Sequence, residues 1–217
     1  MEKIEKIQQA YRDHVLANGA EPPSVFIFMK KLKMSEAEFY DYYTNFESIE
    51  QDAWLRYFEQ ALGAVEAEEV YQQYSVREKL LAFYYTWVEI LKKDRSFVVY
   101  SYKRLPSTSQ RLPMTRPVGH LAAFKTAFYN FATELMLEGR ESKEVVIRPV
   151  LSDRYVDGLW AQCLYLLDFW VKDTSRGFES TDTAIEKTVN TSFDLLGPSV
   201  VDSVLDLAKF MYQNRMP

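Results

Sequence analysis

The sequence has few of the residues that enzymes use most often for catalysis or metal binding. It contains one cysteine and two histidines among 217 residues, and His14 and His120 lie far apart along the chain. A single cysteine cannot form an internal disulfide, so Cys163 is typical of a reducing compartment. The sequence also has no phosphate-binding loop, dinucleotide-binding glycine set or nucleophile elbow. We therefore expect no catalytic residues, no metal site and no cofactor, and a protein that is not an enzyme.

Glycine and proline are scarce too, with seven and eight residues. A β architecture rich in turns needs more of both, and runs of alternating polar and apolar residues are missing. Apolar residues recur instead every three to four positions, which is the period of an amphipathic helix. The sequence therefore predicts an all-α protein without a sheet.

Long hydrophobic runs are missing as well. The most apolar stretch, Leu159 to Val171, contains Gln162 and Asp168 and is too short to span a bilayer. The first residues alternate in charge and lack the apolar core of a signal peptide. The net charge of −5 gives the chain as a whole no basic surface for nucleic acid or anionic lipid. We expect a cytoplasmic protein without a membrane span.

The breakers and capping residues divide the chain into short helices. The expected helices cover residues 3–18, 25–32, 36–43, 45–62, 76–93, 96–104, 118–138, 153–173, 181–196 and 199–213. Ser24 is a candidate N-cap, and the expected capping boxes pair Ser35 with Glu38, Thr44 with Glu47, and Ser75 with Glu78. The longest irregular stretch lies at 105–117 and contains three prolines.

The segment from Ser24 to Glu47, SVFIFMKKLKMSEAEFYDYYTNFE, resembles the helix-turn-helix of the TetR family of transcriptional regulators. Its Ser24-Val25 stands where the family has Thr-Val, its 32–35 stretch where the family has Ala-Gly-Val-Ser, and its Phe39-Tyr40 where the family has Leu-Tyr. The resemblance implies a TetR-like fold. It implies a three-helix N-terminal domain at 1–48 and a helical ligand-binding and dimerisation domain at 49–217.

The resemblance also implies a DNA-binding face, because the second helix of a helix-turn-helix enters the major groove. In the family, hydroxyls at the positions of Ser24, Tyr40 and Tyr42 and a lysine at the position of Phe46 hold phosphates. The candidate DNA-binding residues are Ser24, Lys30, Lys33, Ser35, Glu36, Ala37, Tyr40, Asp41 and Tyr42.

Several residues depart from the family pattern. Glu36 and Asp41 place carboxylates on or beside the reading helix, Phe46 replaces the lysine, and Lys33 replaces the turn glycine. Residues 1–60 contain seven Lys and Arg against eleven Asp and Glu, so their net charge is −4. Nonspecific DNA affinity depends on neutralising phosphates, so this charge favours weak binding. A carboxylate can still accept a hydrogen bond from cytosine N4.

The helix expected at 153–173 is apolar on nearly all sides, which requires burial on all sides. We therefore expect a homodimer that pairs through 153–173 and 181–196. The alternative is a central helix in the core of a monomer.

Aromatic residues and methionine crowd the other helices of the body and could line a pocket for an apolar or lipid-like ligand. The candidate ligand-binding residues are Phe83, Trp87, Tyr100, Phe128, Met136 and Trp160. The alternative is that these side chains are simply core, because aromatic stripes at helical spacing usually are. The leading hypothesis is a TetR-like regulator whose DNA binding responds to a small apolar ligand. The other is a TetR-fold protein that no longer binds DNA and acts as a lipid-binding or scaffold protein.

Overall fold

The computed structural model describes residues 2–105, 119–148, 151–198 and 210–211. Helices are the only regular structure among these residues, which confirms the all-α prediction. The expected helix at 199–213 lies almost wholly outside the described residues. Only Phe210 and Met211 of it are described, and both are helical.

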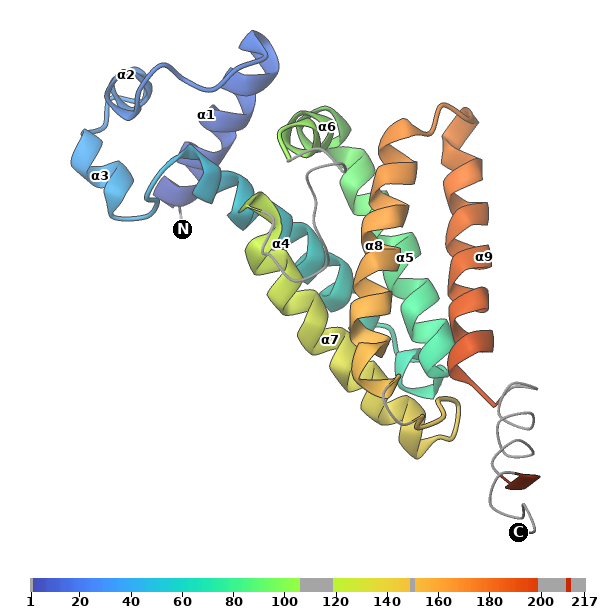
Figure 1. The fold of residues 1–217 in the computed structure, drawn as a ribbon. Coiled ribbons are helices and arrows are strands. Elements are labelled where there is room, and N and C mark those ends of the chain that lie inside the picture. The colour runs from blue at the N-terminus through green and yellow to red at the C-terminus, as the bar shows by residue number, and fades with distance from the viewer. Residues whose placement is uncertain (1, 106–118, 149–150, 199–209, 212–217) are drawn as a thin grey trace. The chain divides into compact units, whose positions relative to one another are not determined.

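Figure 1 shows the described elements along the chain. They are α1 (Glu2–Asn18), α2 (Val25–Lys31), α3 (Glu36–Tyr40), α4 (Phe46–Glu66), η1 (Tyr71–Gln73), α5 (Val76–Lys93), α6 (Arg95–Lys103), η2 (Gly119–Leu121), α7 (Ala122–Glu141), η3 (Ser152–Arg154), α8 (Tyr155–Lys172), η4 (Arg176–Phe178) and α9 (Glu179–Leu196). The chain forms two compact units. The first comprises Met1–Ala67 and Thr86–Phe128, and the second comprises Glu68–Tyr85 and Tyr129–Pro217. The expected domain boundary after residue 48 stays a prediction.

The first three helices, called the head below, form as their caps predict. Gly19 adopts a φ of 67° and donates a hydrogen bond to Val15 O at 2.8 Å, which ends α1. Ser24 caps α2 by accepting from Ile27 N. Ser35 and Glu38 form the predicted capping box of α3. The turn between α2 and α3 contains Lys33, whose φ of 57° is one that glycine adopts without strain.

The start of α4 differs from the prediction. Asn45, not Thr44, is the N-cap, and its capping-box partner is Ser48, not Glu47. Asparagine caps helices better than threonine does, and Ser48 occupies the third helical position that such a box needs. The sequence also predicted that α4 ends near Gly63, whereas the helix continues to Glu66. A single glycine costs a helix only about 1 kcal/mol and so does not end it.

An aromatic core holds the head to α4. Phe28, Phe39 and Phe46 are each at most 8% exposed, and the Phe46 ring lies 5.4 Å from that of Phe28 and 5.6 Å from that of Phe39. Tyr11 of α1 stacks on Phe46 with a centroid distance of 5.4 Å. These contacts place four aromatic rings in one cluster within the first unit.

In the second unit, α8 and α9 run antiparallel and pack against each other (Figure 1). Asp173 closes the turn between them by accepting from the Ser175 backbone and from both the backbone and the hydroxyl of Thr181. Burial opposes the charge of Asp173, but these hydrogen bonds prevail and lower its pKa. Arg148 donates to the carbonyls of Leu195 and Gly197 and so satisfies the end of α9.

Candidate nucleic-acid interface

The head presents the side chains that the sequence predicted for DNA binding. Ser24 is half-buried and its hydroxyl is engaged as a helix cap, with Ile27 N at 3.2 Å. The other candidates are exposed: Lys30, Lys33, Ser35, Glu36, Ala37, Tyr40, Asp41 and Tyr42. The helix-turn-helix therefore keeps its outer face free of the head's own core.

The carboxylates on this face are not all equivalent. Lys3 Nζ donates to Glu38 Oε1 at 2.8 Å, so a cation from α1 offsets this charge. The hydrogen bond from Lys3, followed by those from Ser35, lowers the pKa of Glu38 to about 2. Glu36 accepts a long bond from the Tyr40 hydroxyl, at 3.4 Å, and Asp41 is the exposed C-cap residue of α3. Glu36 and Asp41 thus carry the negative charge that a DNA phosphate would meet.

Phe46 occupies the position of the family's phosphate-binding lysine. Its side chain is 8% exposed and belongs to the aromatic core of the head. This position therefore contributes to packing and cannot contact a phosphate. Lys30 and Lys33 remain as exposed cations on the head, and Lys30 Nζ lies 5.9 Å from the exposed Phe26 ring.

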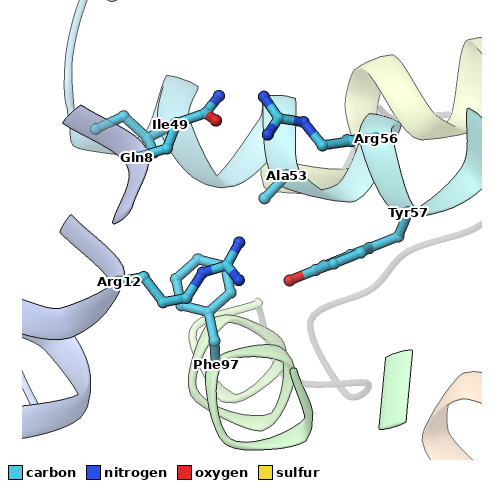
Figure 2. Close-up of a pocket in the computed structure, with 7 residues that line it drawn as sticks. All are labelled: Gln8, Arg12, Ile49, Ala53, Arg56, Tyr57 and Phe97. Atoms are coloured by element: carbon cyan, nitrogen blue, oxygen red, sulfur yellow. The ribbon is translucent and has the colours of Figure 1, made fainter. Parts of the chain in front are cut away.

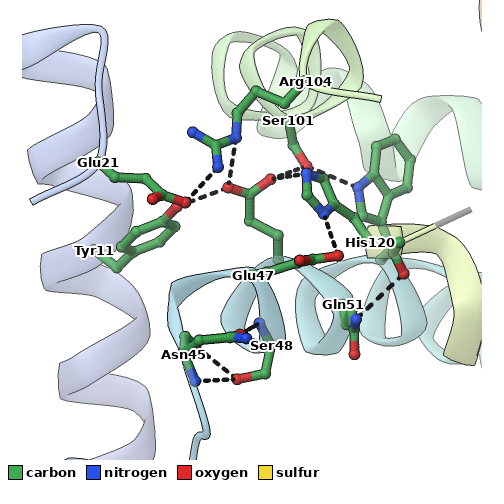
Figure 3. A network of polar contacts seen from close by, with 12 residues as sticks. Tyr11, Glu21, Asn45, Glu47, Ser48, Gln51, Ser101, Arg104 and His120 are labelled. Atoms are coloured by element: carbon green, nitrogen blue, oxygen red, sulfur yellow. Dashed lines mark hydrogen bonds and ion pairs between the residues drawn. The ribbon is translucent and has the colours of Figure 1, made fainter. Parts of the chain in front are cut away.

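A buried polar network behind the head was missed by the sequence reasoning (Figure 3). The carboxylate of Glu50 in α4 is fully buried and accepts from the Tyr11 hydroxyl at 2.7 Å and from the Ser101 hydroxyl at 2.5 Å. Arg104 Nε lies 3.5 Å from the same carboxylate, and its guanidinium also bonds Glu21. The network joins α1, α4 and α6 within the first unit. A glutamate among apolar positions of α4 was its only sequence signal.

His120 borders this network from η2. Its ring is nearly buried, and the ring nitrogens lie 3.2 Å from Glu47 and 3.4 Å from Glu50. Gln51 donates to the Gly119 carbonyl at 3.2 Å and holds the same turn against α4. Glu47, which the sequence placed in a capping box, instead faces this histidine.

A narrow cleft lies between α1, α4 and α6 (Figure 2). Arg12 forms an ion pair with Asp94 and lies over the Phe97 ring, while the Tyr57 hydroxyl donates to Asp94 at 3.0 Å. Arg56 points into the cleft from α4 and pairs loosely with Asp52, at 3.6 Å. Each guanidinium has a carboxylate beside it, so the cleft is close to electrically neutral.

The six candidate ligand-binding residues fall in both units. Phe83, Met136 and Trp160 belong to the second unit, and Trp87, Tyr100 and Phe128 belong to the first. Five of them are at most 2% exposed. Tyr100 is half-buried, and its hydroxyl accepts a hydrogen bond from Arg104. Phe83 packs on Phe131 at a centroid distance of 5.0 Å. Their role in binding a ligand stays a prediction.

The helices expected to form a dimer keep an exposed side. On α8, Gly158, Ala161 and Tyr165 are exposed, and Tyr165 is 51% exposed. On α9, Leu195 is 66% exposed. The opposite side of α8 is buried and carries Trp160, Cys163, Leu167 and Trp170.

The described residues offer little chemistry for catalysis. They contain no cluster of three or more metal-ligating side chains. Cys163 is completely buried, and burial raises the pKa of its thiol well above the ordinary value, which disfavours the reactive thiolate. Within the same residues no helix has the length and hydropathy needed to cross a membrane.

A capped helix-turn-helix followed by a larger helical body defines a two-part, all-α helix-turn-helix protein. Residues 79–211 match the family model described as tetracyclin repressor-like, C-terminal domain. This match covers more than half of the chain, which therefore belongs to the TetR family, a family of regulators. No curated protein matches the chain.

Proposed function

We propose that the protein is a transcriptional regulator that binds DNA through its head. The main support for this proposal is the helix-turn-helix itself, in which α2 and α3 both have side-chain N-caps. Its outer face is exposed, so Lys30 and Lys33 can reach phosphates. Lys3 forms an ion pair with Glu38 and so offsets the repulsion between this carboxylate and a DNA phosphate. Glu36 and Asp41 remain, and either can accept a hydrogen bond from cytosine N4.

The proposed regulator acts as a homodimer, because two heads read two half-sites with more affinity than one. The exposed sides of α8 and α9 support this arrangement, since Tyr165 and Leu195 leave apolar surface uncovered in a single chain. A small apolar effector would alter DNA binding by binding one arrangement of the dimer better than another. The protein thus works by binding and not by catalysis.

A gel-shift assay with the DNA upstream of the protein's own coding sequence tests the proposal. At about 50 mM salt, where electrostatic affinity is strong, we expect a shifted band for the wild type. Changing Lys30, Lys31 and Lys33 to Glu should abolish the band without altering the circular dichroism spectrum. The absence of any shift for the wild type at this salt would rule out the proposed DNA binding.

One observation favours a second function. Phe46 lies in the aromatic core where the family has a phosphate-binding lysine, and Glu36 and Asp41 remain exposed carboxylates on the outer face of the head. A TetR-fold protein that no longer binds DNA and acts as a lipid-binding or scaffold protein would show these features. Native mass spectrometry of the purified protein distinguishes the two. A co-purified lipid together with no gel shift would support the second function.

A further inference from the structure

The outer side of α2 brings two apolar side chains and three lysines together. Phe26 and Ile27, in the first turn of the helix, are 56% and 43% exposed. Lys30 and Lys31 lie one helical turn further on, Lys33 follows in the turn after the helix, and all three are exposed. Lys30 Nζ lies 5.9 Å from the centroid of the Phe26 ring, which places these two side chains on the same side of α2. These five residues are called the α2 face below.

The core of the head does not use the α2 face. Phe28 and Met29 turn inward instead, are at most 3% exposed, and supply the contribution of α2 to the core. A single exposed apolar residue is common on a protein surface, but here two are adjacent and border a group of cations. Apolar surface with a charged rim is the composition of a contact between proteins.

The lysines of the α2 face have no ion-pair partner among the described residues. Lys30, Lys31 and Lys33 form no such pair. The lysines of α1 are engaged, because Lys3 pairs with Glu38 and Lys6 donates to the carbonyl of the last turn of α2. A partner that brings carboxylates therefore neutralises three cations without breaking an existing ion pair.

The apolar part of the α2 face favours a protein segment over other anionic partners. In a helix-turn-helix the first helix of the motif crosses the DNA backbone, which offers phosphates but no apolar pocket for Phe26 and Ile27. An anionic membrane is a broad surface, and it repels a head in which residues 1–60 contain seven Lys and Arg against eleven Asp and Glu. The seven residues of α2 span only about 10 Å, so a short segment meets the α2 face alone.

We propose that the α2 face is a docking site for a short acidic segment of a partner protein, in which carboxylates alternate with large apolar side chains. The carboxylates pair with the three lysines, and the apolar side chains cover Phe26 and Ile27. Lys30 and Lys33 are also the proposed phosphate contacts, so the segment and DNA exclude each other. This competition rests on the proposed DNA binding, whereas the docking itself does not.

Fluorescence anisotropy of a labelled peptide tests the docking site directly. The probe is a peptide of three Asp-Leu-Asp-Phe repeats, titrated with the full-length protein. One control peptide has Lys in place of every Asp, and the other has Ser in place of every Leu and Phe. We expect the wild type to bind the probe with a Kd below about 1 mM and to bind neither control peptide. In the gel shift, an excess of the probe should displace DNA.

Two variants separate docking from DNA binding. Phe26→Ser should weaken binding of the probe by roughly five- to tenfold and leave the gel shift unchanged, because phosphates do not use this ring. The double variant Lys30→Glu, Lys31→Glu should weaken both by at least that factor. The matched controls are Leu137→Ser, at a 53% exposed leucine of α7, and Lys93→Glu, at an exposed lysine of α5. Both controls should bind the probe like the wild type.

The outcomes distinguish the possible partners of the α2 face. A wild type that does not bind the probe, or a Phe26→Ser variant that binds it as tightly as the wild type, would overturn the proposal. Cosedimentation with vesicles of phosphatidylserine and phosphatidylcholine, without binding of the probe, would overturn it in favour of a membrane. Binding of the probe without any gel shift would remove the proposed DNA binding and support the docking site.

Discussion

Lys33 has a left-handed backbone conformation at the turn between α2 and α3, with a φ of 57°. A residue with a Cβ adopts this conformation at a cost of about 1–2 kcal/mol, which is why glycine is usual in such turns. Lys33→Gly relieves this strain in the folded protein, but it also increases the conformational entropy of the unfolded chain, which lowers stability. We expect a net stabilisation of about 0.5–1 kcal/mol, measured by urea unfolding.

Lys31→Gly is the control for Lys33→Gly, because Lys31 is an exposed lysine with a helical backbone at the end of α2. Glycine costs a helix up to about 1 kcal/mol, so this variant should be less stable than the wild type. Equal losses of stability in both variants would show that the conformation at Lys33 is not strained.

Asp173 gives a second prediction for a single residue. Burial opposes its charge, yet hydrogen bonds from Thr181 and Ser175 lower its pKa, so the native state favours the carboxylate. Its stabilising effect is present above the unfolded-state pKa and is lost as the pH falls through the folded-state pKa, below about pH 4. Asp173→Asn should cost about 1–3 kcal/mol at pH 7 by urea unfolding.

The control is Asp194→Asn, which removes a 70% exposed carboxylate of α9 and should change stability by less than about 1 kcal/mol. At acid pH the gap between wild type and Asp173→Asn should narrow, because the wild-type carboxylate becomes protonated. A gap that stays constant from pH 7 to pH 3 would contradict the assigned role of the charge.

Among the elements, α4 begins one residue later than its expected cap at Thr44 predicts. Asn45 accepts from Ser48 N at 2.9 Å, whereas Thr44 lies outside the helix. Asn45→Ala should cost about 1 kcal/mol in urea unfolding, and Thr44→Ala should be close to neutral. A larger loss of stability for Thr44→Ala than for Asn45→Ala would show that Thr44 is the N-cap of α4, as the sequence predicted.

The sequence predicted most helices because their caps and apolar spacing are local properties. Ser35 with Glu38 and Ser75 with Glu78 form the expected boxes, as hydrogen bonds over three residues require no distant partner. Thr44 with Glu47 satisfied the same local pattern, but Asn45 caps α4 and Glu47 contacts His120, 73 positions away in the sequence. Contacts at that separation leave no periodic signal.

The candidate interface was predictable to a similar extent. The exposed face of the head follows from the helix-turn-helix pattern, and the structure leaves every candidate residue except Ser24 exposed. The pairing of Lys3 with Glu38 and the burial of Phe46 were not visible, because both depend on how α1 and α4 pack on the motif. The net charge of the exposed face therefore cannot be obtained by counting the charged residues of the motif alone.

At the scale of the whole molecule, the proposed dimer makes a prediction about α8. Ala161 lies on the exposed side of this helix, so Ala161→Glu should place a charge in the dimer contact and not disturb the monomer's own core. Analytical ultracentrifugation at about 10 µM should show a monomer for this variant and a dimer for the wild type, since an unpaired buried charge costs several kcal/mol.

Leu137→Glu is the matched control, because Leu137 of α7 is 53% exposed and lies outside the proposed contact. It should sediment as a dimer like the wild type. A wild type that sediments as a monomer would contradict the proposed dimer, and a dimeric Ala161→Glu would place the contact elsewhere.

We propose that the exposed face of the head binds DNA with few phosphate contacts, and the salt dependence of binding measures the number of these contacts. The logarithm of the association constant falls with the logarithm of salt concentration by roughly 0.9 per neutralised phosphate. With Lys30 and Lys33 on each of two heads, we predict a slope of about −3 to −4 by fluorescence anisotropy, and a slope smaller by about 2 for Lys33→Glu. Binding that does not depend on salt, or a slope unchanged by Lys33→Glu, would contradict the assignment of this face.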